Sequence, residues 1–154
     1  MAELKVLIPY NFTGVDRKSL DFAIQAYGQE KEVKITLLHT YVSLPQIEPA
    51  SNTVMSRLSS NMHYLRSELL EKEKEINQIK QYLMDGGFRD DQIDYDFKPR
   101  SKSVADEIIA TAKTRGSKII ILSYRPHRIT RAFIQSVHNK VISTLKDVTV
   151  CVVT

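Results

Sequence analysis

The sequence predicts an α/β protein in which helices cover both faces of a parallel β-sheet. Two apolar runs, residues 6–8 and 118–122, are continuous rather than alternating, which is typical of strands buried on both faces. Residues 33–39 form a third buried strand, and segments with helical spacing of their apolar residues separate the strands. Five strands and four helices alternate along the chain, which predicts a three-layer α/β/α sandwich with right-handed crossovers.

The composition indicates one soluble globular domain spanning residues 1–154. Hydrophobic residues make up 42% of the chain and charged residues 26%, values that exclude a disordered protein. The net charge of +4 permits contact with phosphates or acidic surfaces but does not demand nucleic acid. We therefore expect no nucleic-acid partner.

Three features predict a cytoplasmic protein. The chain begins directly with a strand and shows no signal-peptide pattern. No apolar run approaches the roughly 20 residues needed to span a bilayer, so we expect no membrane partner. Cys151 is the only cysteine, which rules out an intramolecular disulfide and favours a reducing compartment.

The first half of the chain supplies two strands and two helices. Thr13 or Asp16 can cap a helix that follows the first strand and ends at Gly28. After the second strand, residues 41–53 contain two prolines and predict an irregular segment, which could act as a lid. A long helix over residues 55–84 then stops at a pair of glycines.

One apolar stripe runs along this long helix. Its residues step by threes and fours, with Lys72 as the one interruption. Such a stripe predicts a helix face packed on the sheet rather than a coiled coil. The residues of the stripe are Leu58, Met62, Leu65, Leu69, Ile76, Ile79 and Leu83.

The second half supplies the remaining strands and helices. Residues 93–97 alternate strictly, so we expect this strand at a sheet edge with Asp94 and Asp96 on its exposed face. Ser103 and Asp106 form the capping pair of a helix that ends at Gly116. A helix beginning near Arg131 and a strand over residues 148–153 close the chain.

The loop after residues 118–122 is the first candidate for a ligand site, because open α/β sheets bind ligands beyond the ends of such strands. It has no glycine, but Arg125, His127, Arg128 and Arg131 fall within seven residues, and Tyr124 adds a stacking face. Arginine can fork onto phosphate oxygens. Two interpretations stand: the arginines bind an anion, or they face water or the acidic surface of a partner.

Common catalytic and metal-binding motifs are absent. The chain has no GxxxxGK[ST] loop, no GxGxxG after the first strand and no GxSxG elbow. Its four histidines lack ligand spacing, and His39 at the end of a strand is interpreted as a core or hydrogen-bonding residue. We expect no catalytic residues and no metal site.

Several phrases in order resemble the universal stress protein (Usp) family. Residues 6–13, VLIPYNFT, are similar to its opening I-L-V-P-x-D-F-S, and residues 36–40, TLLHT, to its second strand. Residues 103–109, 116–122 and 136–141 resemble its third helix, fourth strand and fourth helix. The resemblance covers nearly the whole chain.

This resemblance implies a stress-response protein of the adenine nucleotide alpha hydrolase-like fold, with strand order 3-2-1-4-5. It also implies a homodimer paired through the last strand, with Val148, Val150 and Val152 as interface candidates. An edge strand that pairs with its twin is no longer exposed. The family contains members that bind ATP and members that do not.

The ATP-binding motif of the family is degenerate in this chain. Its three glycine positions fall nearest Ser123, Pro126 and Gln135, and the Asp after the first strand is Asn11. Pro126 removes a backbone donor. Only Ser136, at the final Ser/Thr position, matches. Asn11 is either a turn-forming residue or a ligand contact.

Two hypotheses follow. The first is a non-enzymatic, homodimeric regulatory module that is not a standard ATP binder. The second is a nucleotide (ATP or AMP) or phosphometabolite binder that uses the arginine loop, with ATP and Mg²⁺ and weak ATP hydrolysis as possibilities. The candidate binding residues are Pro9, Tyr10, Asn11, Thr40, Ser123, Arg125, Arg128, Arg131, Ser136 and Val137.

A receiver-like signalling domain is a third five-stranded possibility. Such a domain needs an acidic cluster after its first strand. Tyr10, Asn11 and Phe12 offer no acid there, so we set this alternative aside.

Overall fold

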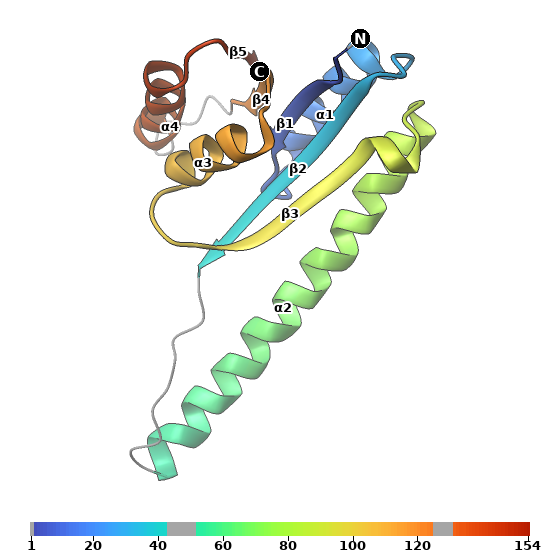
Figure 1. The fold of residues 1–154 in the computed structure, drawn as a ribbon. Helices are drawn as coiled ribbons and strands as arrows, with labels where there is room; N and C mark the ends of the chain where they lie inside the picture. The colour runs from blue at the N-terminus through green and yellow to red at the C-terminus, as the bar shows by residue number, and fades with distance from the viewer. Residues whose placement is uncertain (1, 43–51, 125–130) are drawn as a thin grey trace.

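The computed structural model describes the backbone of residues 2–42, 52–124 and 131–154, and the side chains of these except 52–61 and 131–136. Five parallel strands form one sheet of order β3-β2-β1-β4-β5, which confirms both the fold class and the strand order that the resemblance implied (Figure 1). The strands are β1 Leu4–Pro9, β2 Val33–Val42, β3 Ile93–Arg100, β4 Ile119–Ser123 and β5 Thr149–Val153.

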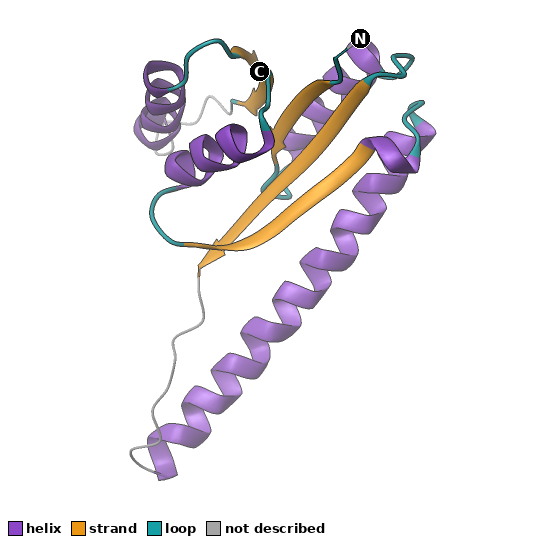
Figure 2. Cartoon of the chain, viewed as in Figure 1, coloured by secondary structure: helices purple, strands orange, loops and turns teal. Residues whose placement is uncertain are grey.

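Four helices connect the strands, as Figure 2 shows. They are α1 Gly14–Tyr27, α2 Asn52–Asp85, α3 Val104–Arg115 and α4 Arg131–Thr144, and a 3-10 turn, η1 Asp90–Gln92, precedes β3. Ser103 caps α3 with Asp106 as predicted, and Gly116 ends it in the left-handed conformation, with φ 65°. Within the described residues, no helix combines the length and the apolar character needed to cross a bilayer.

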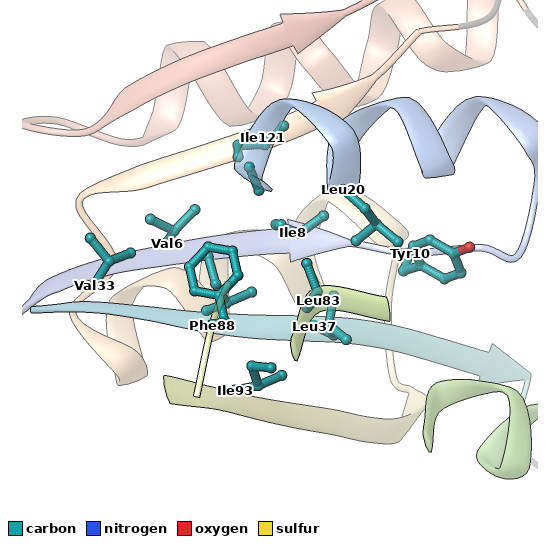
Figure 3. Close-up of a cluster of buried hydrophobic side chains, with 12 residues drawn as sticks. Val6, Ile8, Tyr10, Leu20, Val33, Leu37, Leu83, Phe88, Ile93 and Ile121 are labelled. Carbon is teal, nitrogen blue, oxygen red and sulfur yellow. The ribbon is translucent and has the colours of Figure 1, made fainter. Parts of the chain in front are cut away.

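The sheet separates two hydrophobic clusters. On one face, Leu20 and Ala23 of α1 and Leu83 of α2 pack against Ile8 and Leu37 (Figure 3). On the other face, α3 and α4 cover the sheet. The buried residues of this second cluster are Leu7, Leu38, Ala105, Ile108, Ile109, Ala112, Ile120, Leu122 and Val141.

Among the residues of helix α2 whose side chains are described, those of its C-terminal half pack on the sheet. Its 34 residues span about 50 Å, whereas the eight residues of β3 span about 26 Å. Ile76 and Leu83 are fully buried, but Leu65 is 36% and Leu70 60% exposed. The helix therefore extends beyond the sheet (Figure 1). Of the described stripe residues before Lys72, only Leu65 is exposed, and the predicted packing is wrong for it, whereas Leu70 lies outside the stripe.

The two edges of the sheet differ in chemistry. Edge strand β3 carries Asp94 and Asp96, which both pair with Arg115 of α3, so the face of this strand toward α3 is charged. Edge strand β5 presents Val152, which is 46% exposed. Val148 was expected in this last strand but precedes it and packs against the buried cluster under α3 and α4.

Candidate functional site

A buried carboxylate joins the ends of β1 and β4. Asp16, in the first turn of α1, is only 3% exposed. It accepts hydrogen bonds from the backbone N–H groups of Asn11 and Thr13, both at 3.0 Å, and from the Thr13 hydroxyl at 2.8 Å. The Ser123 hydroxyl at the end of β4 also donates to Asp16. These bonds tie the turn after β1 to the neighbouring strand, where the strand order of the sheet reverses.

The turn after β1 contains a strained residue. Phe12 has a φ of 61°, in the left-handed region that bulky side chains rarely adopt. The two amides that Asp16 binds belong to Asn11 and Thr13, on either side of it. Asp16 therefore holds the backbone that keeps Phe12 in this conformation, and such strain is typical of functional sites.

His39, near the end of β2, is fixed between aromatic rings. Its ring stacks on Phe97 with centroids 5.1 Å apart and meets the edge of Phe12 at 4.8 Å. The Nδ1 atom lies 2.8 Å from the carbonyl oxygen of Tyr10. Because a carbonyl only accepts, Nδ1 donates, and Nε2 of the neutral ring is left as an acceptor.

The environment of His39 favours its neutral form. Burial lowers the pKa of His39, and the nearby charges of Lys72 and Arg100 lower it further, against the opposing effect of the Tyr10 carbonyl. The ring is therefore neutral at pH 7. The charges of Lys72 and Arg100 therefore act on His39 at this end of the sheet.

A cavity of about 350 Å³ lies beside His39, at the carboxyl ends of the strands on the β3 side of the sheet. This volume is at the lower end of the range of small-molecule sites. The turn after β1, strand β2 and the end of β3 contribute Asn11, His39, Thr40, Tyr41, Val42 and Arg100. Helix α2 contributes Leu65, Glu68, Leu69 and Lys72.

Two cations line this cavity without a carboxylate partner. No ion pair within 4.0 Å joins Lys72 or Arg100 to any residue in the described part of the chain. The Lys72 ammonium lies 5.5 Å from the centre of the Phe12 ring. The Nε atom of Arg100 is buried and has no hydrogen-bond partner among the described residues. Such a pair can bind an anion.

The structure brings together only part of the predicted site. Asn11 and Thr40 line the cavity. Pro9 ends β1, and Tyr10 is buried in the core and gives its carbonyl to His39. Ser123 bonds to Asp16 instead of facing the cavity, and Val137 packs against the cluster under α3 and α4. Of the arginine loop, Arg125 and Arg128 lie outside the described residues, and only the backbone of Arg131 and Ser136 is described, in α4.

Sequence reasoning missed three residues at this edge. It interpreted His39 as a core residue, noted Lys72 only as an interruption of a stripe, and did not single out Arg100. Lys72, at a position where the helix faces the sheet, was a usable signal, because burying a charged group costs free energy unless a partner compensates. The position of Arg100 at the carboxyl end of a strand was a second one.

The fold and this edge define a class of protein: three-layer α/β proteins with a small-molecule cavity beyond the carboxyl ends of parallel strands. The match to a family model is more specific. The chain belongs to the Universal stress protein family, whose model covers residues 4–152. A comparison with curated proteins found no match.

Solved structures of this family share the fold. The universal stress protein UspA from Lactobacillus plantarum has a TM-score of 0.71 and 16% identity, with 100% of this chain and 99% of that chain covered. A universal stress protein from Archaeoglobus fulgidus in complex with dAMP has a TM-score of 0.66 and 13% identity, with both chains covered completely, at 100%. Another, in complex with cAMP, has a TM-score of 0.62 and 12% identity over 100% of this chain and 98% of that chain. At these identities the likeness shows the fold alone.

Proposed function

We propose that the chain is a cytoplasmic, non-enzymatic regulatory module that binds an adenine nucleotide or a related phosphometabolite. The observation that carries the proposal is the cavity of about 350 Å³ lined by Asn11, Thr40 and two cations, Lys72 and Arg100, for which the described residues supply no ion-pair partner. It lies at the edge where α/β sheets of this kind bind ligands. Two structures with the same fold are described as complexes with dAMP and cAMP, which supports the class of ligand.

The lining offers contacts for a base as well as for an anion. Asn11 can donate and accept hydrogen bonds, and the free Nε2 of His39 can accept one from an amino group. Tyr41 lines the cavity and packs on Phe97, with ring centroids 5.2 Å apart. An aromatic face of this kind can stack with a purine.

The arrangement favours binding over proton transfer. The Nδ1 atom of His39 is engaged by the Tyr10 carbonyl, and burial keeps the ring neutral. Lys72 and Arg100 offer positive charge and donors. These groups stabilise a bound anion without activating a nucleophile.

Isothermal titration with ATP and Mg²⁺, AMP and adenosine tests this proposal, after denaturation has shown whether a nucleotide co-purifies. We expect saturable binding of an adenine nucleotide, weakened by Tyr41→Ala, and no release of phosphate from ATP. Tyr95→Ala is the matched control, because Tyr95 is an exposed tyrosine of β3 that does not line the cavity. Absence of heat for every ligand, with no nucleotide released, contradicts the proposal.

We also propose that the module is a homodimer paired through β5. This strand forms one edge of the sheet, and Val152 is an exposed apolar residue on it. We expect a dimer at micromolar concentration in light-scattering chromatography and a monomer for Val152→Lys. Leu70→Lys, at an exposed apolar position of α2 outside β5, is the control that keeps the dimer. A monomeric wild-type protein contradicts this part of the proposal.

A further inference from the structure

We propose that Lys72 and Arg100 form an anion-binding subsite that holds the phosphate of a mononucleotide. The subsite lies between α2 and the end of β3, so the phosphate is bound on the β3 side of the sheet and not by the loop after β4. This inference rests on the proposed function, because it assigns the acidic group of the same ligand.

The first observation is the place of Lys72 in α2. It occupies a position of the apolar stripe, between Leu69, which lines the cavity, and Ile76, which is fully buried. A lysine in such a stripe brings its ammonium toward the sheet. It lies half-buried over the Phe12 ring at 5.5 Å, a contact that makes up for little of the lost hydration. An anionic ligand would supply the missing partner.

The second observation is the unsatisfied donor of Arg100. The Nε atom of this side chain is buried without a hydrogen-bond partner among the described residues. A buried charged donor of this kind is costly to leave unpaired. The side chain also lines the cavity, where its guanidinium can form parallel hydrogen bonds with two oxygens of a phosphate.

The third observation is the balance of charge around the cavity. Among the described lining residues, Glu68 is the only carboxylate against the two cations. Glu68 is exposed and accepts a hydrogen bond from the Tyr64 hydroxyl at 3.2 Å. The lining therefore keeps a net positive charge, which also lowers the pKa of His39.

The other half of the carboxyl end of the sheet, at the ends of β1 and β4, disfavours a phosphate. There the Asp16 carboxylate lies between the ends of β1 and β4 and accepts hydrogen bonds from the turn and from Ser123. A buried negative charge repels a phosphate group.

Titrations with AMP and adenosine test the subsite, because the two ligands differ only in the phosphate. We expect the wild-type protein to bind AMP at least about tenfold more tightly than adenosine, and each of Lys72→Gln and Arg100→Gln to lose about that factor for AMP alone. Lys74→Gln, an exposed lysine of α2 outside the cavity, should change neither affinity. Unchanged adenosine affinity shows that the variants are folded.

Other outcomes overturn the inference. Equal affinity of the wild type for AMP and adenosine would show that the phosphate has no partner. Loss of AMP affinity in Arg125→Ala plus Arg128→Ala, with full affinity in Lys72→Gln and Arg100→Gln, would place the phosphate at the loop after β4. Both results leave the proposed function intact, whereas binding of neither ligand contradicts the inference and the proposed function together.

Discussion

The two halves of the carboxyl end of the sheet both contain charged groups that are buried or half-buried, and they differ in the partners that the described residues offer these groups. At the ends of β1 and β4, the buried Asp16 carboxylate is satisfied by the turn after β1 and by Ser123. At the ends of β2 and β3, Lys72 and Arg100 line a cavity without a carboxylate partner in the described part of the chain. The first half is complete in the folded protein, and we propose that a ligand completes the second half.

This difference shows where stability and function separate. A satisfied buried group contributes to the free energy of folding, whereas an unsatisfied one lowers it and persists where activity requires it. We therefore expect substitutions in the two halves to have effects of different size and sign.

The largest effect is expected for Asp16→Ala. Removing the carboxylate leaves the Asn11 and Thr13 amides without their acceptor and frees the strained turn at Phe12. The free energy of unfolding should fall by about 3 kcal/mol, measured by urea denaturation. Asp21→Ala is the control, because Asp21 accepts a hydrogen bond only from Tyr82 at the surface among the described residues, and its loss should cost less than about 1 kcal/mol. Equal losses in the two variants would show that the β1–β4 half is not specially stabilised.

A smaller effect is expected from protonation of His39. Because the folded pKa lies below 6.5, the unfolded chain takes up the proton first, and stability falls as the pH drops below 6.5. The loss is at most about 1.4 kcal/mol per pH unit for one group. His39→Phe should flatten the dependence between pH 6.5 and about 5.5, above the range where carboxylates titrate. His63→Phe, at an exposed position of α2, should not.

The pKa of His39 also measures the electrostatic effect of Lys72 and Arg100 on this ring. Burial lowers the pKa of His39 most, Lys72 and Arg100 lower it further, and the Tyr10 carbonyl and Asp16 raise it. In Lys72→Gln the pKa of His39, followed by NMR, should move up toward its ordinary value. An unchanged pKa would mean that the cations of the β3 side do not act on the ring.

The smallest effect is expected for the stability of Lys72→Gln and Arg100→Gln. Neutralising a cation that has no ion-pair partner among the described residues should leave the free energy of unfolding within about 0.5 kcal/mol of the wild type or raise it. Inorganic phosphate should raise the melting temperature of the wild type and not that of the variants. A loss as large as that of Asp16→Ala would show that the cations are structural, and the comparison would fail.

The sequence predicted the fold better than the site. Continuous apolar runs identified the buried strands, and strict alternation in residues 93–97 identified an edge. The strand order came only from the family resemblance, because periodicity does not determine which strands pair. The length of α2 was close to the prediction, but its extension beyond the sheet could not be foreseen, since only tertiary packing shows where the sheet ends.

At the site, Asn11 and Thr40 were predicted because each follows a predicted strand, at the carboxyl end of the sheet where open α/β folds bind ligands. Arg100 reaches the cavity because β3 pairs with β2 in a register that sets it opposite Val42, which no local pattern reveals. Asp16 was predicted as a helix cap, but its bond to Ser123 joins positions 107 residues apart. Arg125 and Arg128 remain a prediction, because they lie outside the described residues.

A crystal structure of the complex with AMP tests the central claim most directly. The account predicts the phosphate within hydrogen-bond distance of the Lys72 ammonium and the Arg100 guanidinium, with the base near His39 and Tyr41. A phosphate bound by the loop after β4 and the start of α4, with no ligand between α2 and β3, would contradict it.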